Sequence, residues 1–239
     1  RAGDVAMREG DAGEEMFVVI EGEFEVSSHG TAVRTLEAGD IFGELALLGS
    51  ARRRATVVAK SDGVVVPVDR ERFEYLVRYA PSFALTVLRS VSALLHDLSD
   101  RAVSNGIAPS DGRAIAETAS QLEVFHDDAS VRAYAAGDSI LAAGESEGSM
   151  FVVIAGRVEI GRDPAGNVVT AGRGDVFGEM ALCDSQSHAQ GAKALTEARI
   201  VPIDVLRFRE LVQNNPQFAI EVMRTMAERT QMRVDAFDA

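Results

Sequence analysis

Residues 42–59 read FGELALLGSARRRATVVA, and this stretch decides the fold that we predict. Gly43 has no side chain, so the backbone at this position can approach a ligand closely. The apolar run at residues 45–48 is long enough for one helical turn, whose first N–H groups lack intrahelical partners and attract an anion. Arg53 follows Glu44 at nine positions. A turn, a carboxylate and a guanidinium in this order suit the phosphate and sugar of a nucleotide.

The chain contains the same pattern twice. Phe-Val-Val-Ile occurs at residues 17–20 and again at 151–154, and Phe-Gly-Glu occurs at 42–44 and again at 177–179. Motifs that recur in the same order over about half of a chain indicate two copies of one fold. We therefore predict two tandem domains.

Each copy is predicted to belong to the α+β class and to be mainly β. Short apolar or alternating runs in the first copy predict strands at residues 16–20, 24–26, 32–36, 56–59 and 64–68. Several short strands with frequent turns are typical of an antiparallel jelly roll or barrel. The turn-rich segment 105–112 separates the copies, so we place the domains at residues 1–108 and 109–239.

Helices are predicted to follow the strands of each copy. Asp69 is a typical N-cap for a helix at residues 70–79, and Pro81 begins a second helix that carries an apolar stripe over residues 83–98. The second copy ends in a matching helix that begins at Pro216. The stripe or the C-terminal helix could form a homodimer seam, although packing onto its own domain is the commoner use of such a face.

The composition of the chain argues against several classes of function. The 239 residues include 37 acidic and 24 basic side chains, a net charge of −13, which predicts neither a nucleic-acid partner nor an anionic membrane surface. No apolar run reaches the roughly 18 residues that span a bilayer. A single cysteine, Cys183, favours the reducing cytoplasm. His29, His96 and His126 do not have the spacing of metal ligands, and no catalytic motif is present, so we predict no metal, no cofactor and no enzyme activity.

The stretch at residues 42–59 closely resembles the phosphate-binding cassette of the cyclic nucleotide-binding domain family. Phe-Gly-Glu-Leu-Ala-Leu, the spacing from Glu to Arg, and Arg-x-Ala-Thr-Val carry this resemblance. The resemblance implies that Glu44 binds the ribose 2′-hydroxyl, that Arg53 binds the cyclic phosphate, and that backbone amides complete the site. The implied ligand-binding residues are Gly43, Glu44, Leu45, Ala46, Arg53, Arg54, Ala55 and Thr56.

The resemblance leaves the base open. In the family, the position after the arginine helps to select the base and is commonly Ala, Ser or Thr, whereas it is Arg54 here. We expect cyclic AMP as the ligand, with cyclic GMP as the alternative. Phe125 and Tyr134 are candidates to cover the base from the second copy, and the alternative is that both fill the core of that copy.

The resemblance also implies a moving part and a segment before the first strand. In the family, the helices after the barrel close over the base, which makes the helices at residues 70–79 and from Pro81 the hinge and lid. A short helical bundle and a first strand precede the barrel. Residues 111–136 can supply them in the second copy, so we expect that the first copy lacks its beginning in this sequence.

The second cassette, residues 177–194, reads FGEMALCDSQSHAQGAKA and differs at its key position. His188 stands where Arg53 stands in the first cassette. A largely neutral imidazole cannot donate hydrogen bonds to two phosphate oxygens at once, as a guanidinium does. We expect a degenerate site in a structural or docking module; the alternatives are a changed ligand and a weak, pH-sensitive site. Its residues would be Gly178, Glu179, Met180, Ala181, His188 and Ala189.

These observations favour a non-catalytic cyclic nucleotide sensor that acts on an unidentified protein effector. Two alternatives stay open. One is a nucleotide-independent scaffold or the regulatory portion of a larger enzyme, against which the intact pair of Glu44 and Arg53 argues. The other is a transcription regulator of the catabolite activator type, which would need a helix-turn-helix for which the sequence after the last helix has no room.

Overall fold

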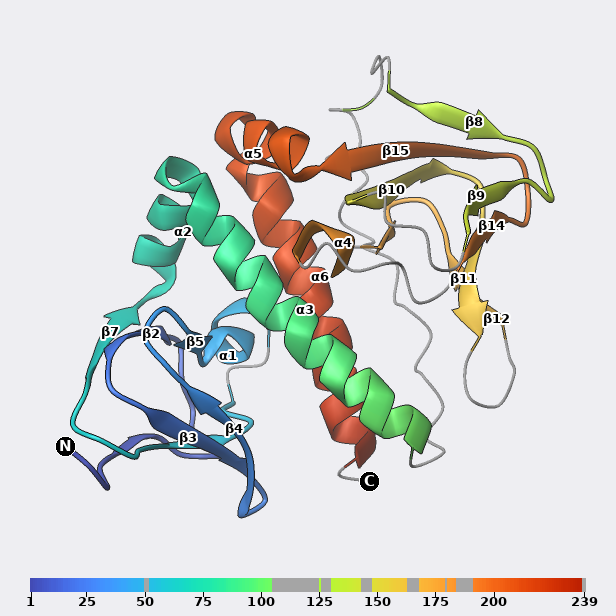
Figure 1. Ribbon diagram of the computed structural model, residues 1–239. Helices are drawn as coiled ribbons and strands as arrows, with labels where there is room; N and C mark the ends of the chain where they lie inside the picture. Colours follow the sequence, from blue (N-terminus) through green and yellow to red (C-terminus); the bar gives the residue numbers. More distant parts are fainter. Residues whose placement is uncertain are drawn as a thin grey trace. The chain divides into compact units, whose positions relative to one another are not determined.

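The computed structural model (Figure 1) describes residues 1–49, 52–104, 125, 130–142, 148–162, 168–178, 180–183 and 191–237. The backbone forms two compact units, Arg1–Val91 and Ser92–Ala239. The predicted domain boundary at residues 108 and 109 lies outside the described residues.

Among the described residues, the first unit forms two antiparallel sheets (Figure 1). Across the larger sheet, the strands are β1 (Val5–Met7), β6 (Thr56–Ala59), β3 (Phe24–Ser28) and β4 (Thr31–Leu36). Across the smaller sheet, they are β5 (Ile41–Phe42), β2 (Met16–Glu21) and β7 (Val64–Val68). The five predicted strands are all present, each within two residues of its expected ends. β1 and β5 were not predicted, because two or three residues are too few to show an alternating pattern.

Both sheets of the first unit contribute side chains to one apolar core. Alternate residues of β2 show how: Val19 is 1% exposed, whereas Ile20 on the opposite face is 47% exposed. Burial of one such aliphatic or aromatic side chain stabilises the fold by about 1.5–3 kcal/mol. The core residues are Met7, Val19, Phe24, Leu36, Phe42, Val57 and Ala59.

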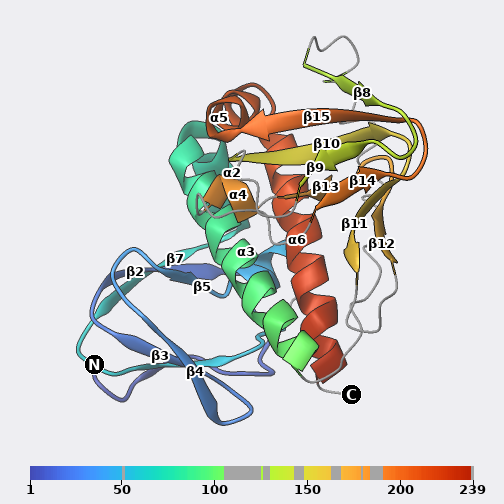
Figure 2. The ribbon, with the colours of Figure 1, turned by 45° about the vertical axis from the view of Figure 1, so that its right-hand side comes forward.

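The second unit repeats this arrangement (Figure 2). In one sheet, the described strands are β13 (Val176–Phe177), β10 (Ser149–Ala155), β15 (Ala198–Asp204) and β8 (Arg132–Tyr134). In the other, they are β12 (Val168–Ala171), β11 (Val158–Arg162), β14 (Ala192–Ala194) and β9 (Ser139–Leu141). Phe151 stacks on Phe177 with ring centroids 5.1 Å apart, as Phe17 stacks on Phe42 at 5.0 Å in the first unit. Two copies of one mainly β fold are therefore confirmed.

Of the described helices, α1 and α4 lie between strands, and the other four follow the strands of their copy as the sequence predicts. They are α1 (Glu44–Leu48), α2 (Arg70–Tyr79), α3 (Pro81–Ser104), α4 (Met180–Cys183), α5 (Val205–Asn214) and α6 (Pro216–Phe237). The division between the two units falls within α3. α2 ends just before Pro81, because a residue that precedes proline is disfavoured in the helical conformation.

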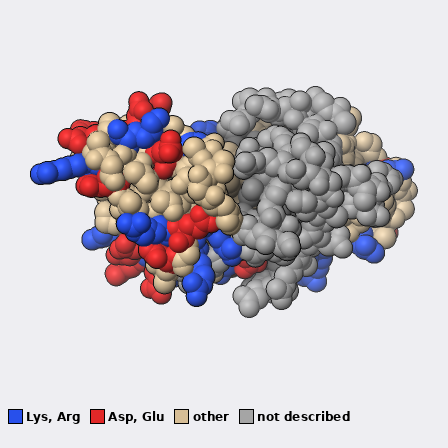
Figure 3. Space-filling view, turned by 90° about the horizontal axis from the view of Figure 1, so that it is seen from below, with Lys and Arg blue, Asp and Glu red and all other residues tan. Residues whose placement is uncertain are grey.

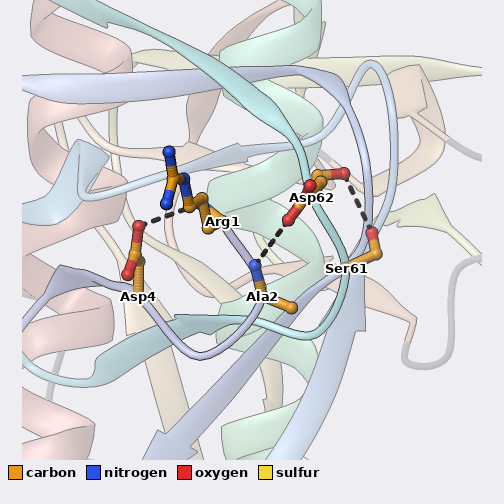
Figure 4. Close-up of polar contacts among 5 residues, drawn as sticks. All are labelled: Arg1, Ala2, Asp4, Ser61 and Asp62. Atoms are coloured by element: carbon orange, nitrogen blue, oxygen red, sulfur yellow. Dashed lines mark hydrogen bonds and ion pairs between the residues drawn. The ribbon is translucent and has the colours of Figure 1, made fainter.

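The first residues of the chain are held against the turn between β6 and β7 (Figure 4). The backbone N–H of Ala2 donates to Oδ1 of Asp62 at 2.9 Å, and the hydroxyl of Ser61 donates to the carbonyl of Asp62 at 3.2 Å. The backbone nitrogen of Arg1 donates to Oδ2 of Asp4 at 2.9 Å. These groups are exposed, so they position the segment that leads to β1 but add little stability.

The carboxylate of Asp69 caps α2, and its removal is expected to destabilise the first unit. The carboxylate accepts a hydrogen bond from the backbone N–H of Arg72 at 2.8 Å, as Asp204 does for Arg207 at α5. We expect Asp69→Ala to lower the free energy of unfolding by about 1 kcal/mol. Asp69→Asn, which keeps a capping oxygen, should stay close to the wild type. Urea denaturation measures both, and equal midpoints for wild type and Asp69→Ala would contradict this role.

Candidate functional site

Gly43 begins the cassette with a backbone turn that requires glycine. Its φ is +80°, in the left-handed region, and it forms the N-cap of α1. A Cβ added to Gly43 would lie 2.6 Å from Nη1 of Arg53 and 3.2 Å from the carbonyl oxygen of Glu15. Glycine is thus needed both for the turn and for the close approach of Arg53. All five residues of α1, Leu45 and Ala46 among them, are buried.

Arg53 lies inside the first unit and is fixed by several groups. It is 7% exposed. Its Nη1 donates to the carbonyl oxygens of Glu15, at 2.5 Å, and Gly43, at 3.1 Å. Its guanidinium carbon lies 5.5 Å from the centroid of the Phe17 ring, within the range of a cation–π interaction. The guanidinium is therefore held in place before any ligand binds.

Gly13 provides the space for this guanidinium, and it was not predicted from the sequence. A Cβ added to Gly13 would lie 2.0 Å from Nε and 2.3 Å from Cζ of Arg53. Real Cβ atoms essentially never come this close to another heavy atom. The only sequence signal was the Gly-Asp-Ala-Gly turn before β2.

Glu44 is the buried acid of the site. It is 5% exposed, and its Oε1 accepts a hydrogen bond from the hydroxyl of Ser90 on α3 at 3.5 Å. Burial raises the pKa of Glu44, while hydrogen bonds and the charges of Arg34 and Arg53 oppose this rise. Burial lowers the pKa of Arg53, and the charges of Glu15, Glu44 and Asp11 oppose this change. A buried acid beside a buried base is typical of a functional site.

The rest of the arginine triplet lies nearer the surface. Arg52 is exposed and donates to the carbonyl of Gly10 at 3.0 Å. Arg54, Ala55 and Thr56 are half-buried. The hydroxyl of Thr56 accepts a hydrogen bond from the backbone N–H of Glu9 at 3.1 Å, which ties the cassette to the turn after β1. The structure thus brings Gly43, Glu44 and Arg53 together.

Arg34 is a second guanidinium near Glu44, and it was not predicted from the sequence. It lies on β4, opposite Val26 of β3, and its Nη2 donates to the carbonyl of Ile41 at 3.3 Å. Its charge is one of those that lower the pKa of Glu44. A signal was available: Leu36 faces the core, and the period of two residues in a strand places Arg34 on the same face.

Comparison with known proteins identifies the family. The profile of the cyclic nucleotide-binding domain matches residues 1–79 and 131–215. The chain belongs to the cyclic nucleotide-binding domain family. Each unit therefore contains one cyclic nucleotide-binding domain, which agrees with the two-fold repeat of strands and helices.

Several relatives of this family cover both domains. The chain is 26% identical over 250 residues to the cAMP-dependent protein kinase regulatory subunit of Schizosaccharomyces pombe, a match over 98% of this chain and 56% of that protein. It is 29% identical over 212 residues to the cGMP-dependent protein kinase egl-4 of Caenorhabditis briggsae, over 82% of this chain and 26% of that protein. The chain thus spans only part of these relatives.

A solved structure of cAMP-bound PfPKA-R, residues 141–441, is also similar. Its sequence is 26% identical to this chain, and the match covers 90% of this chain and 72% of that one. The TM-score is 0.38.

In its described part, the cassette of the second cyclic nucleotide-binding domain begins like that of the first domain. Gly178 has a φ of +71°, Ala181 and Leu182 are buried, and Met180 and Cys183 bound α4. Glu179, His188 and Ala189 lie outside the described residues, so the degenerate second site stays a prediction.

Phe125 and Tyr134 pack within the second domain. Phe125 is fully buried and meets Phe218 edge-on, with ring centroids 5.7 Å apart. The guanidinium of Arg207 lies 6.0 Å from its ring centroid and also hydrogen-bonds Ser130. Tyr134 packs against the core of the same domain. This is the core-filling role that we gave as the alternative to a cover over the base.

The described residues lack two other kinds of site. No group of His, Cys, Asp and Glu there could hold a metal ion, and no described helix is long and apolar enough to cross a bilayer. On the face drawn in Figure 3, basic and acidic side chains are interspersed over the described surface. That part of the face has no large field of one sign.

Proposed function

We propose that the first domain binds a 3′,5′-cyclic nucleotide and that the chain acts as a sensor without catalytic activity of its own. The observation that carries this proposal is Arg53, a guanidinium that is 7% exposed and fixed beside Glu44 and Gly43. Burial of a charge is costly unless an opposite charge accompanies it. The charges of Glu15, Glu44 and Asp11 offset part of this cost, and a ligand phosphate at Arg53 would add a further opposite charge.

The groups around Arg53 suit the parts of such a ligand. The guanidinium offers a planar set of N–H donors for phosphate oxygens. The first backbone N–H groups of α1, at Glu44, Leu45 and Ala46, lack intrahelical partners and carry a partial positive charge. The carboxylate of Glu44 can accept a hydrogen bond from a sugar hydroxyl.

Through the contacts between α1 and the helices after the barrel, a bound ligand can shift the arrangement of those helices. Glu44 accepts from Ser90 of α3, and the guanidinium of Arg70 on α2 donates to the carbonyl of Leu47 at 2.8 Å. A sugar hydroxyl at Glu44 would compete with Ser90. The ligand can shift these helices only by binding one of their arrangements more tightly than another. A protein effector would respond to this shift of the helices. We place this function in the cytoplasm.

The identities of the protein effector and of the nucleotide base are also part of this proposal. The resemblance led us to expect cyclic AMP, while the relatives include a cAMP-dependent and a cGMP-dependent kinase system. The second of these is by its name a protein kinase, which supports the regulatory portion of a larger enzyme as a second candidate function. A homodimer through helix 83–98 or the C-terminal helix stays a prediction.

The number of ligands per chain tests the unequal roles of the two domains. Since His188 replaces the arginine of the second cassette, we expect one tight site per chain near neutral pH. Equilibrium dialysis with radiolabelled cyclic AMP and cyclic GMP measures this number. A control variant, Ser187→Ala, changes the residue beside His188 and should not change the number of ligands bound per chain. Two equally tight sites would contradict the degenerate second domain, and binding of neither nucleotide would contradict the sensor.

A further inference from the structure

Ser90 places a hydroxyl of α3 against the buried carboxylate of Glu44. Val87 and Val91, which lie near Ser90 in the sequence of α3, are fully buried, so this part of the helix is packed into the first unit. The hydroxyl of Ser90 donates to Oε1 of Glu44 at 3.5 Å. Hydrogen bonds between a hydroxyl and an oxygen are usually about 2.7–2.8 Å long, so this bond is weak and another donor can replace it.

The carboxylate of Glu44 has little room for a further donor. Glu44 is 5% exposed, and its carboxylate accepts hydrogen bonds from its own backbone N–H and from Ser90. Burial raises the pKa of Glu44, and these hydrogen bonds oppose the rise. A buried carboxylate that loses a donor is costly, so the Ser90 hydroxyl can leave only if another donor replaces it.

We propose that Ser90 is an internal substitute for the ribose 2′-hydroxyl, so that α3 and the sugar of the ligand bind Glu44 in turn. In the free domain, Ser90 ties α3 to α1. A ligand with a 2′-hydroxyl takes the place of Ser90, whereas a 2′-deoxy ligand leaves Ser90 bound. The response of α3 therefore depends on one hydroxyl of the ligand. This inference rests on the proposed function and names the group of the ligand that acts on α3.

The other contact between α1 and the helices after the barrel does not compete with the ligand. Arg70 of α2 donates to the carbonyl of Leu47, near the C-terminal end of α1. The proposed ligand lies at the N-terminal end of α1, where the first N–H groups lack intrahelical partners. The ligand can thus replace Ser90 without disturbing Arg70, and the 2′-hydroxyl acts on α3 rather than on α2.

Paired titrations of the full chain with cyclic AMP and 2′-deoxy cyclic AMP test this replacement. In Ser90→Ala, Glu44 has no internal donor with which the ribose must compete. Cyclic AMP should therefore bind about two- to tenfold more tightly than to the wild type. The affinity for 2′-deoxy cyclic AMP should stay nearly unchanged. Isothermal titration calorimetry measures both affinities, and the corresponding pair of cyclic GMP ligands serves if the domain prefers guanine.

Two variants control for other effects of a substitution in α3. Ser90→Thr keeps the hydroxyl and should bind both ligands like the wild type. The second copy has Thr225 at the corresponding position, nine residues after the proline that begins α6. Thr86→Ala removes a hydroxyl one turn earlier in α3, which donates to the carbonyl of Ser82 at 3.1 Å. It should leave both affinities unchanged.

Hydrogen–deuterium exchange of the backbone amides at residues 84–91 follows α3 directly. In the wild type, we expect saturating cyclic AMP to increase the exchange rate and saturating 2′-deoxy cyclic AMP to leave it at the value of the free protein. In Ser90→Ala, the two ligands should give the same exchange rate. Equal exchange rates with both ligands in the wild type would contradict the replacement of Ser90.

Two results of the titrations would also overturn the role of Ser90 and leave the proposed function intact. One is a Ser90→Ala protein that binds cyclic AMP no more tightly than the wild type does. The other is an equal change of both affinities in Ser90→Ala, which would mean that Ser90 acts independently of the 2′-hydroxyl. If the wild type bound none of these nucleotides, the proposed function itself would be contradicted.

Discussion

Replacement of Arg53 by alanine is expected to weaken cyclic nucleotide binding by about 30-fold to a few thousand-fold. This range corresponds to the roughly 2–5 kcal/mol lost when one partner of a buried charge pair is removed. Arg53 is fixed by the carbonyls of Glu15 and Gly43, and its guanidinium is the buried cation of the cassette. Isothermal titration calorimetry measures the loss directly.

Two further variants distinguish the contribution of the charge of Arg53 to affinity from the contribution of its planar shape and from any effect on folding. Arg53→Lys keeps the charge but not the planar fork, so its loss should be smaller than that of Arg53→Ala. Arg52→Ala removes an exposed neighbour and should bind like the wild type. Circular dichroism checks that each variant is folded. A folded Arg53→Ala protein with wild-type affinity would place the ligand elsewhere.

A single methyl group at Gly13 is expected to weaken binding at least tenfold, which is about 1.4 kcal/mol, without changing any charge. The new Cβ would lie 2.0 Å from Nε of Arg53, so the guanidinium must leave its position. Gly13 does not adopt the left-handed backbone conformation, so alanine causes no backbone strain there. Calorimetry and thermal unfolding of Gly13→Ala should show a large loss of affinity and a small loss of stability.

A double-mutant cycle shows whether Gly13 acts through Arg53. If it does, Gly13→Ala should have almost no further effect on affinity in a protein that already carries Arg53→Ala. Additive losses in the double variant would mean that Gly13 affects the ligand by another route. Residual affinity in the double variant can be compared at high nucleotide concentration.

Local sequence signals were enough to place the main elements. α2 has its expected bounds because Asp69 caps its start and Pro81 follows its end, both of which are signals within a few residues. Strands of four residues or more show their period of two. β1 and β5 do not, because their formation depends on pairing with β6 and β2, which lie far away in the sequence.

The site was predictable only where its residues lie in one motif. Gly43, Glu44 and Arg53 share the cassette, and the structure brings them together. Gly13, Glu15 and Arg34 join them only after the barrel closes, because 38 residues separate Glu15 from Arg53. The carbonyl of Glu15 is a backbone group, which no residue type reveals. Arg34 had a visible signal, a charge on the inner face of a strand, but its proximity to Glu44 required the fold.

A crystal structure of the full chain with bound cyclic AMP or cyclic GMP would test most directly whether Arg53 binds the phosphate. We predict a nucleotide in the first domain, with phosphate oxygens about 2.7–3.2 Å from the guanidinium nitrogens of Arg53 and a sugar hydroxyl at Glu44. A nucleotide bound only at residues 177–194, or one in the first domain with Arg53 turned out to solvent, would contradict the account.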